Sequence, residues 1–202
     1  MRGIMLLKGE PYGGKIDDEG AYVVCCDGAY EWAKDRVRID ENIGDFDSLS
    51  YVPDPPPKEI YPSEKDFTDG EIALFRLIGM GVSQIEIYGG GGGREDHFLG
   101  NLHLLYAADA RGVSAKMITD YSEIYIGKNR VELNGMKGVT FSVLPFGGTL
   151  HIMESTGLKY AEPPVINYGQ CIGVSNIVSH NSAGLVIAEG DRALIIVNRG
   201  KL

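Results

Sequence analysis

The spacing of apolar residues changes near residue 120 of the chain. Before this point, short apolar runs alternate with longer segments in which apolar residues recur at i, i+3 and i+4. This alternation is typical of β-α units built around a mainly parallel sheet with helices on its faces. The pattern predicts strands over residues 4–7, 22–26, 60–61, 84–88 and 115–118, and helices over residues 29–37, 69–79 and 96–110.

After Asp120 the helical period disappears, and short alternating runs follow one another between Gly, Asn and Pro turns. Such runs predict strands over residues 123–126, 131–133, 140–144, 150–153, 185–188 and 193–197. We therefore expect two domains. Residues 1–119 should form an α/β domain with a mainly parallel sheet flanked by helices, and residues 120–202 an all-β sandwich.

Composition narrows the classes of partner. The 202 residues carry a formal net charge of -9, without the clustered Lys and Arg that a nucleic-acid backbone requires. No apolar run approaches the ~20 residues of a membrane helix, and residues 1–10 lack the layout of a signal peptide. Three cysteines without a CxxC spacing favour a reducing compartment. We expect a cytoplasmic protein that binds neither nucleic acid nor membrane.

A pair of carboxylates follows the first predicted helix. In Gly44-Asp45-Phe46-Asp47-Ser48 the two aspartates would project to one side of an extended segment, while Phe46 points away into the core. Oxygen ligands of this kind suit Mg²⁺, which takes one or two protein carboxylates and shares its other positions with water and phosphate. A turn in which Asp and Ser bond their own backbone is the commoner structure for an isolated pair.

A second acidic segment precedes the helix predicted over residues 69–79. Thr68 and Glu71 have the spacing of a capping box, and the helix dipole favours Asp69 in the first turn. These local effects leave Asp66 unexplained. Both aspartates would lie at the mouth of a β-α loop, where α/β sheets bind ligands.

Five consecutive glycines, Gly89 to Gly93, follow the strand predicted over residues 84–88, and Arg94 and Asp96 come next. Glycines retained there indicate close backbone approach or exposed N–H groups, for which a phosphate chain is the natural ligand. A flexible surface loop is the alternative for the glycines alone. Because all three motifs lie where a strand passes into a helix, they should meet at one edge of a parallel sheet. The sequence predicts a magnesium-dependent enzyme that acts on a nucleotide polyphosphate.

These motifs resemble the thiamine pyrophosphokinase family in their order along nearly the whole chain. The matching segments are Asp27-Gly28-Ala29, Gly44-Asp45-Phe46-Asp47-Ser48, Asp66-Phe67-Thr68-Asp69-x-Glu71-x-Ala73-Leu74, Gly92-Gly93-Arg94-x-Asp96-His97-x-x-x-Asn101 and Ser175-Asn176. The resemblance implies transfer of a pyrophosphoryl group from ATP to the hydroxyl of thiamine, which gives thiamine diphosphate and AMP.

The resemblance also implies roles for individual residues. Mg²⁺ would be held by Asp45, Asp47 and Asp69, and these three with Asp96 would be catalytic. The nucleotide would contact Asp27, Gly28, Asp66, Gly92, Gly93, Arg94 and Asn101, and thiamine would contact Lys65, Ser175 and Asn176. In this family the β domain of a partner subunit contributes to the thiamine pocket, which implies a homodimer. Asp69 or Asp96 would accept the hydroxyl proton.

The chain departs from the family pattern at several positions, namely Ala29, Phe67, Glu95 and Ile177. Its β domain has no tryptophan, because Trp32 lies in the first predicted helix and is expected in the core. Tyr160 and Tyr168 are candidate substitutes, although packing is the commoner role for such tyrosines. Two alternatives follow: a related pyrophosphokinase acting on another alcohol, such as a hydroxymethylpterin, and a nucleotide-binding module without activity.

Overall fold

The computed structural model describes residues 1–46, 49, 51–57, 60 and 66–200. The chain divides into two compact units, Met1–Asp120 (unit 1) and Tyr121–Lys201 (unit 2). In the part of the chain that the structure describes, no helix is both long and apolar enough to cross a membrane.

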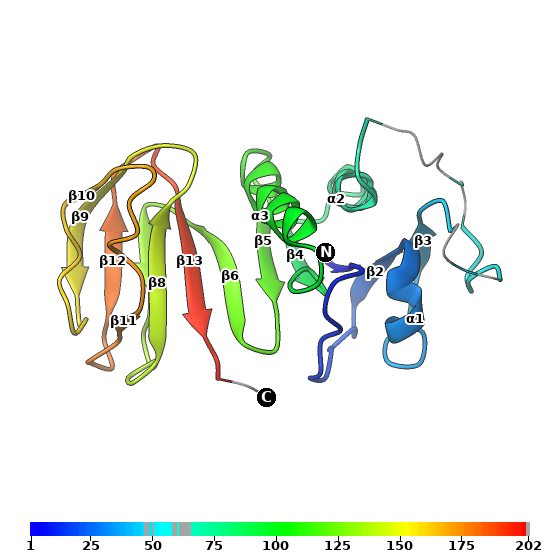
Figure 1. The fold of residues 1–202 in the computed structure, drawn as a ribbon, viewed down its shortest axis with the longest axis horizontal. Coiled ribbons are helices and arrows are strands. Elements are labelled where there is room, and N and C mark those ends of the chain that lie inside the picture. Colours follow the sequence, from blue (N-terminus) through cyan, green and yellow to red (C-terminus); the bar gives the residue numbers. More distant parts are fainter. Residues whose placement is uncertain (47–48, 50, 58–59, 61–65, 201–202) are drawn as a thin grey trace. The chain divides into compact units, whose positions relative to one another are not determined.

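Unit 1 is built on five parallel strands in the order β3-β2-β1-β4-β5 (Figure 1). The strands are β1 (Arg2–Leu6), β2 (Ala21–Cys26), β3 (Glu41–Ile43), β4 (Gln84–Tyr88) and β5 (Ser114–Ile118). The helices are η1 (Asp27–Ala29), α1 (Tyr30–Ala33), α2 (Asp69–Gly79) and α3 (Glu95–Asp109). Chain order reverses between the neighbours β1 and β4, so a topological switch point lies at the centre of the sheet, where such folds bind ligands.

Alternate residues of the strands bury against different partners. Ile4 and Leu6 of β1 join a core with α1 and the segment of residues 8–20, which we call the strap. On the opposite face, a side chain at Gly3 would lie 3.1 Å from Leu77 of α2. Because side chains alternate along a strand, each face of the sheet receives its own cover. The strap thus takes the place of a crossover helix between β1 and β2.

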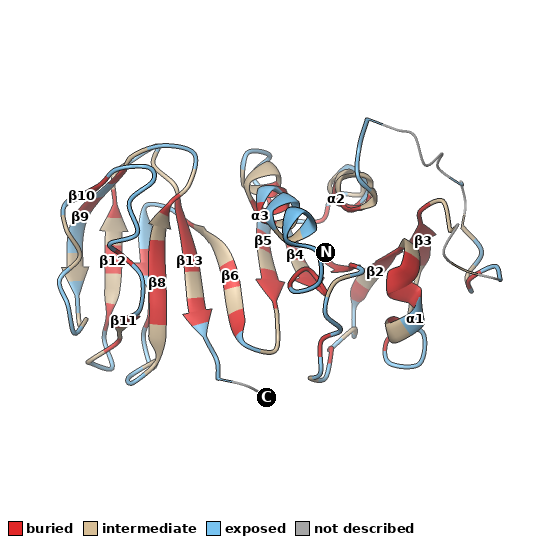
Figure 2. Ribbon diagram, viewed as in Figure 1, coloured by how far each residue is buried: buried red, intermediate tan, exposed pale blue. Residues whose placement is uncertain are grey.

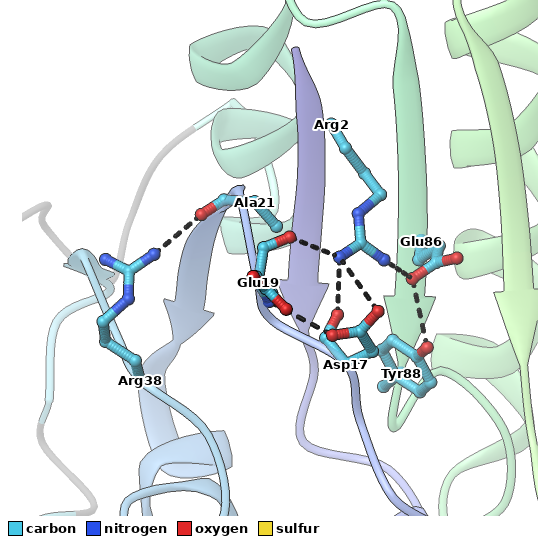
Figure 3. Close-up of polar contacts among 7 residues, drawn as sticks. All are labelled: Arg2, Asp17, Glu19, Ala21, Arg38, Glu86 and Tyr88. Atoms are coloured by element: carbon cyan, nitrogen blue, oxygen red, sulfur yellow. Dashed lines mark hydrogen bonds and ion pairs between the residues drawn. The ribbon is translucent and has the colours of Figure 1, made fainter.

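Arginine side chains hold the strap against the sheet (Figure 3). The Nη2 atom of Arg2 donates to the carbonyls of Asp17 at 2.7 Å and Glu19 at 3.0 Å, and its Nη1 atom donates to Glu86 on β4 at 3.2 Å. The Tyr88 hydroxyl donates to the same Glu86 carboxylate at 3.2 Å. These bonds fix the path of the strap against β1 and β4.

Unit 2 contains two antiparallel sheets, one in the order β6-β13-β8-β11 and the other β10-β9-β12-β7. The strands are β6 (Ser122–Gly127), β7 (Arg130–Glu132), β8 (Thr140–Pro145), β9 (Leu150–Thr156), β10 (Val165–Ile166), β11 (Asn176–Ile177), β12 (Gly184–Ile187) and β13 (Ala193–Asn198). One core joins both sheets, with Phe141 and Ile195 from the first packed with Leu150 and Leu185 from the second. Figure 2 shows buried positions running along β8 and β13.

Long periodic segments match their predicted bounds. The helix predicted over residues 69–79 and the strand predicted over residues 84–88 are α2 and β4. The Thr68–Glu71 capping box is confirmed, because the Thr68 side chain accepts from the Glu71 N–H and the Glu71 carboxylate accepts from the Thr68 N–H. Trp32 packs against the core of unit 1, as predicted.

Two predictions for unit 1 were wrong. The helix expected over residues 29–37 is α helix only from Tyr30 to Ala33, after the 3₁₀ turn η1. Beyond it, the Arg36 guanidinium reaches the carbonyls of Tyr12 and Gly14 in the strap. The strand expected over residues 60–61 is absent at Ile60, and Tyr61 lies outside the described residues.

The fifth parallel strand is instead β3, which sequence patterns did not indicate. It has three residues and begins with a charged one, Glu41, which is only 6% exposed. The Glu41 carboxylate accepts from the Tyr22 hydroxyl at 2.9 Å and from the Arg76 Nε at 3.1 Å. A buried carboxylate is stable with such partners, and both partners are remote in sequence.

Candidate active site at the carboxyl edge of the parallel sheet

The acidic segments of unit 1 meet around the end of β2. A side chain at Gly44 would come within 2.9 Å of the Asp27 Cβ, so the backbone at the end of β3 lies directly against Asp27. The Cys26 thiol donates to the Asp69 carbonyl at 3.7 Å. Asp27, Asp45 and Asp69, which come from three separate stretches of sequence, therefore border the same part of the sheet edge.

The backbone is not extended at Phe46, so the expectation of an extended segment was wrong there. Phe46 has a φ of 54°, in the left-handed region, and Leu49 N donates to the Phe46 carbonyl at 3.0 Å. Phe46 is half-buried. Asp47 lies outside the described residues, so the structure does not test whether the two carboxylates share a side.

Asp69 is the first residue of α2, and its side chain is partly buried, whereas Asp66 is exposed. A side chain at Gly70 would come within 3.1 Å of Leu104 in α3 and 3.7 Å of Leu7. The start of α2 is thus held close to the end of β1. Lys65 lies outside the described residues.

The glycine run after β4 divides into two parts with different roles. At Gly89 an added Cβ would lie 2.2 Å from the Leu7 carbonyl oxygen, and at Gly90 it would lie 2.9 Å from the Met117 sulfur. Gly9 N donates to the Gly89 carbonyl at 2.7 Å. Gly89 is therefore required by backbone contact with the end of β1 and Gly90 by contact with the Met117 side chain of β5, so a flexible surface loop is the wrong description of them.

The last two glycines are exposed and adopt the left-handed conformation, with φ of 66° at Gly92 and 71° at Gly93. Space is open around Gly93, since an added Cβ would meet no atom within 4 Å. Asn101 of α3 donates through Nδ2 to the Gly90 carbonyl at 2.9 Å and so ties the run to the helix. The end of the run thus presents accessible backbone where a phosphate chain could approach.

Arg94 and Asp96 form a two-pronged ion pair at the start of α3. Arg94 Nε lies 3.1 Å from Asp96 Oδ1, and Arg94 Nη2 lies 2.6 Å from Asp96 Oδ2. The hydrogen bond from Arg94 lowers the pKa of Asp96, and the pair raises the pKa of Arg94. Both side chains are mostly exposed, at 72% and 64%. The pair is therefore accessible, and Asp96 is a weaker base than an ordinary aspartate.

The fit to Mg²⁺ rests on the kind of donor present. Within the described residues, no three His, Cys, Asp or Glu side chains are grouped closely enough to hold a metal ion. Asp45 and Asp69 nevertheless offer hard carboxylate oxygens at one strand edge. This set fits an ion that takes one or two protein carboxylates and completes its shell with water and phosphate.

In unit 2 the two predicted substrate residues differ sharply. Ser175 is exposed, with a φ of 62°. Asn176 is 4% exposed, and its amide makes four hydrogen bonds within unit 2. Its Oδ1 accepts from the N–H groups of Tyr160 and Ile177, and its Nδ2 donates to the Tyr160 carbonyl and Glu162. Asn176 thus shapes the chain around Ser175.

Two tyrosines of unit 2 are surface residues. Tyr160 is 57% exposed and Tyr168 is 69% exposed, so neither is a packing residue of the unit 2 core. Exposed tyrosine rings offer a flat apolar face and a hydroxyl to a ligand or a partner.

A parallel α/β sheet with acidic side chains and exposed glycine N–H groups at its switch-point edge is typical of enzymes that bind phosphorylated ligands. Residues 15–117 match the family model of the thiamin pyrophosphokinase catalytic domain. The chain is also 31% identical over 160 residues to the thiamine pyrophosphokinase of Bacillus subtilis, and the match covers 74% of each protein. The chain therefore belongs to the thiamin pyrophosphokinase family of enzymes.

Solved structures agree with this assignment. The crystal structure of thiamine pyrophosphokinase from Bacillus subtilis superposes with a TM-score of 0.80 at 25% identity, over 100% of this chain and 99% of that one. Thiamin pyrophosphokinase from Candida albicans has the same fold, with a TM-score of 0.68 at 19% identity, over 98% of this chain and 88% of that one.

Proposed function

We propose that this enzyme transfers the pyrophosphoryl group of ATP to the hydroxyl of thiamine. The hydroxyl oxygen would bond to the β-phosphorus, the bond from that phosphorus to the bridging oxygen of AMP would break, and thiamine diphosphate and AMP would leave. One observation carries the proposal. Residues at the edge of unit 1 that match the family pattern, Asp27, Asp45 and Asp69, border the same strand end although they are distant in sequence.

The nucleotide would bind at the exposed end of the glycine run. Backbone N–H groups at Gly92 and Gly93 and the Arg94 guanidinium would hold phosphate oxygens, with Asp66 and Gly28 beside them. Arg94 matches phosphate geometry because its planar fork donates two parallel hydrogen bonds. Asn101 would contribute by holding the run in place through the Gly90 carbonyl.

Mg²⁺ would be held by Asp45 and Asp69, together with Asp47. When bound, the ion would neutralise part of the phosphate charge that opposes the approaching hydroxyl. A carboxylate at this edge would take the hydroxyl proton. Asp69 and Asp96 are the candidates, and the hydrogen bond from Arg94 lowers the pKa of Asp96, which makes it a weaker acceptor than an ordinary aspartate.

Thiamine would be recognised through unit 2, which we regard as a β-sandwich. Ser175 would contact the substrate, Asn176 would fix the local backbone, and the exposed ring of Tyr160 or Tyr168 would stack on thiamine in place of a tryptophan. Lys65 would also contact thiamine. By the family pattern, unit 2 of a second copy would complete each site, so we propose a homodimer in the cytoplasm.

The test is product formation by the purified protein. With MgATP and thiamine we expect equal amounts of AMP and thiamine diphosphate, quantified by chromatography and phosphorus NMR. A panel of primary alcohols, including a hydroxymethylpterin, should react far more slowly. Faster AMP release with another alcohol would identify that alcohol, and not thiamine, as the substrate. Nucleotide binding in calorimetry without AMP formation for any alcohol would overturn the enzymatic proposal.

A further inference from the structure

Lys8 occupies the central position of the candidate site, although no sequence motif drew attention to it. It follows directly after β1, the strand that lies between β2 and β4 in the sheet. The carboxyl ends of β2 and β4 carry Asp27 and the glycine run, respectively. Lys8 is therefore placed at the topological switch point between the acidic and the glycine-rich halves of the edge.

The neighbours of Lys8 fix its position on both sides. Its Nζ atom lies 3.6 Å from Asp27 Oδ2. On the other side, a Cβ at Gly9 would lie 2.5 Å from the Gly89 carbonyl oxygen and 2.4 Å from that of Gly91. The backbone after Lys8 is thus packed directly against the glycine run, and its side chain reaches the end of β2.

Gly28 provides the space that the Lys8 side chain uses. A Cβ added at Gly28 would lie 2.5 to 2.6 Å from the Cδ, Cε and Nζ atoms of Lys8. The φ of Gly28 is not in the left-handed region, so the backbone there would accept an alanine. The absence of a side chain at residue 28 is therefore explained by the course of the Lys8 side chain.

The charge balance at this edge indicates what Lys8 binds. Asp27, Asp45 and Asp69 make the edge acidic, while a nucleotide polyphosphate is itself strongly anionic. Arg94 pairs with both oxygens of Asp96 at the start of α3, and Lys8 pairs with Asp27 at the end of β2 while its side chain stays 57% exposed. A lysine ammonium is a compact charge on a flexible stem, and it binds phosphate as a point charge.

We propose that Lys8 binds the polyphosphate of the nucleotide directly, with Asp27 and Gly28 guiding its side chain between β2 and the glycine run. This inference rests on the proposed function and adds a binding residue to the same site. The Lys8 ammonium would neutralise phosphate oxygens on the β1 side while Arg94 does so from α3. Asp27 would act as a positioning residue through Lys8.

The experiment measures nucleotide binding, so that it does not depend on turnover. We would determine the affinity of the full-length protein for α,β-methylene-ATP with Mg²⁺ by calorimetry, because this analogue cannot transfer its pyrophosphoryl group. Lys8→Met should weaken binding about 10- to 100-fold, the loss expected for one charge-assisted contact, and Lys8→Arg should recover most of it. Lys15→Met, which removes an exposed lysine of the same strap, should bind like the wild type.

Gly28 offers a second and independent variant. Gly28→Ala should displace the flexible end of Lys8 and weaken analogue binding several-fold. In a Lys8→Ala background the same change should have a clearly smaller effect, because the side chain that it displaces is gone. The melting temperature of each variant would be measured without ligand. If the role of Lys8 were purely structural, its substitution would lower the melting temperature without a selective loss of nucleotide affinity.

Three outcomes would overturn the assignment of Lys8. They are unchanged analogue affinity in Lys8→Met, a loss in Lys8→Met that Lys8→Arg does not recover, and no analogue binding by the wild type. The proposed function fails differently. If the wild type binds the analogue through Lys8 and yet forms no thiamine diphosphate from thiamine and MgATP, the role of Lys8 stands and the reaction is wrong.

Discussion

The edge of unit 1 and the Ser175–Asn176 corner of unit 2 both match the family pattern, but they use their polar groups differently. At the unit 1 edge, backbone packing at Gly44 and Gly89 brings together side chains that still reach the surface, such as Arg94. In unit 2, the Asn176 amide is buried and all four of its hydrogen bonds stay inside the unit. Membership of a motif therefore does not assign a role, because the partners of a side chain decide whether it can meet a ligand.

The largest expected effect separates catalysis from folding at the unit 1 edge. Asp69→Asn should lower kcat by about 10³-fold or more, because it removes a charge that the proposed site uses to hold Mg²⁺ or accept a proton. Its effect on stability should stay below about 1 kcal/mol, the scale of a helix-dipole interaction. Steady-state kinetics and urea unfolding check both values.

Asp35→Asn is the matched control, since Asp35 is exposed and lies after α1. It should leave kcat and stability close to the wild-type values. Wild-type turnover in Asp69→Asn would remove Asp69 from the catalytic set.

The two parts of the glycine run should respond differently to the same substitution. Gly89→Ala would force a Cβ against the Leu7 carbonyl oxygen at a positive φ, and should cost about 3 kcal/mol of unfolding free energy or more. Gly93→Ala meets open space and should cost about 1 kcal/mol for its φ alone. Although Gly93→Ala should be the less destabilising of the two variants, it should raise KM for MgATP, because Gly93 lies in the proposed phosphate site. Equal destabilisation by the two variants would contradict the division of the run.

In unit 2, Asn176 and Ser175 should separate stability from substrate binding. Asn176→Ala leaves the N–H groups of Tyr160 and Ile177 without the oxygen that they share, and should cost about 2 to 4 kcal/mol. Ser175→Ala should be nearly neutral for stability and should raise KM for thiamine. Chemical unfolding and kinetics on both variants make the comparison, and the opposite pattern would assign the substrate contact to Asn176.

The smallest effect concerns Glu162, the carboxylate that accepts from Asn176. Burial raises its pKa, although the Asn176 hydrogen bond opposes the rise. A raised folded-state pKa stabilises the protein below the unfolded-state pKa, and that stabilisation is lost as pH rises through the folded-state value. Glu162→Gln removes this pH-dependent loss. The difference in melting temperature, variant minus wild type, should therefore increase by about 1 to 3 °C from pH 4 to pH 7. Glu154→Gln, an exposed control on β9, should give no such trend.

Local sequence information was sufficient for much of unit 1. The 3.6-residue period and the capping box of α2 lie within a few residues of one another, so the sequence determined the helix and its first residue. The junction from β4 through the glycine run into α3 was predictable for the same reason, whereas the strand that precedes Asp45 was not. That the acidic segments and the glycine run meet at one sheet edge followed from the geometry of parallel strands.

Only the tertiary structure decided the remaining features, because each depends on residues far apart in the chain. β3 exists as a buried strand because Arg76 and Tyr22 compensate Glu41, and no local pattern records that arrangement. In the same way, five identical glycines divide into packed and open positions according to which residues at and after the ends of β1 and β5 lie against them. The sequence determined the long periodic elements and their order, while contacts across the sheet decided the short strand β3 and which of the polar groups remain accessible to a ligand.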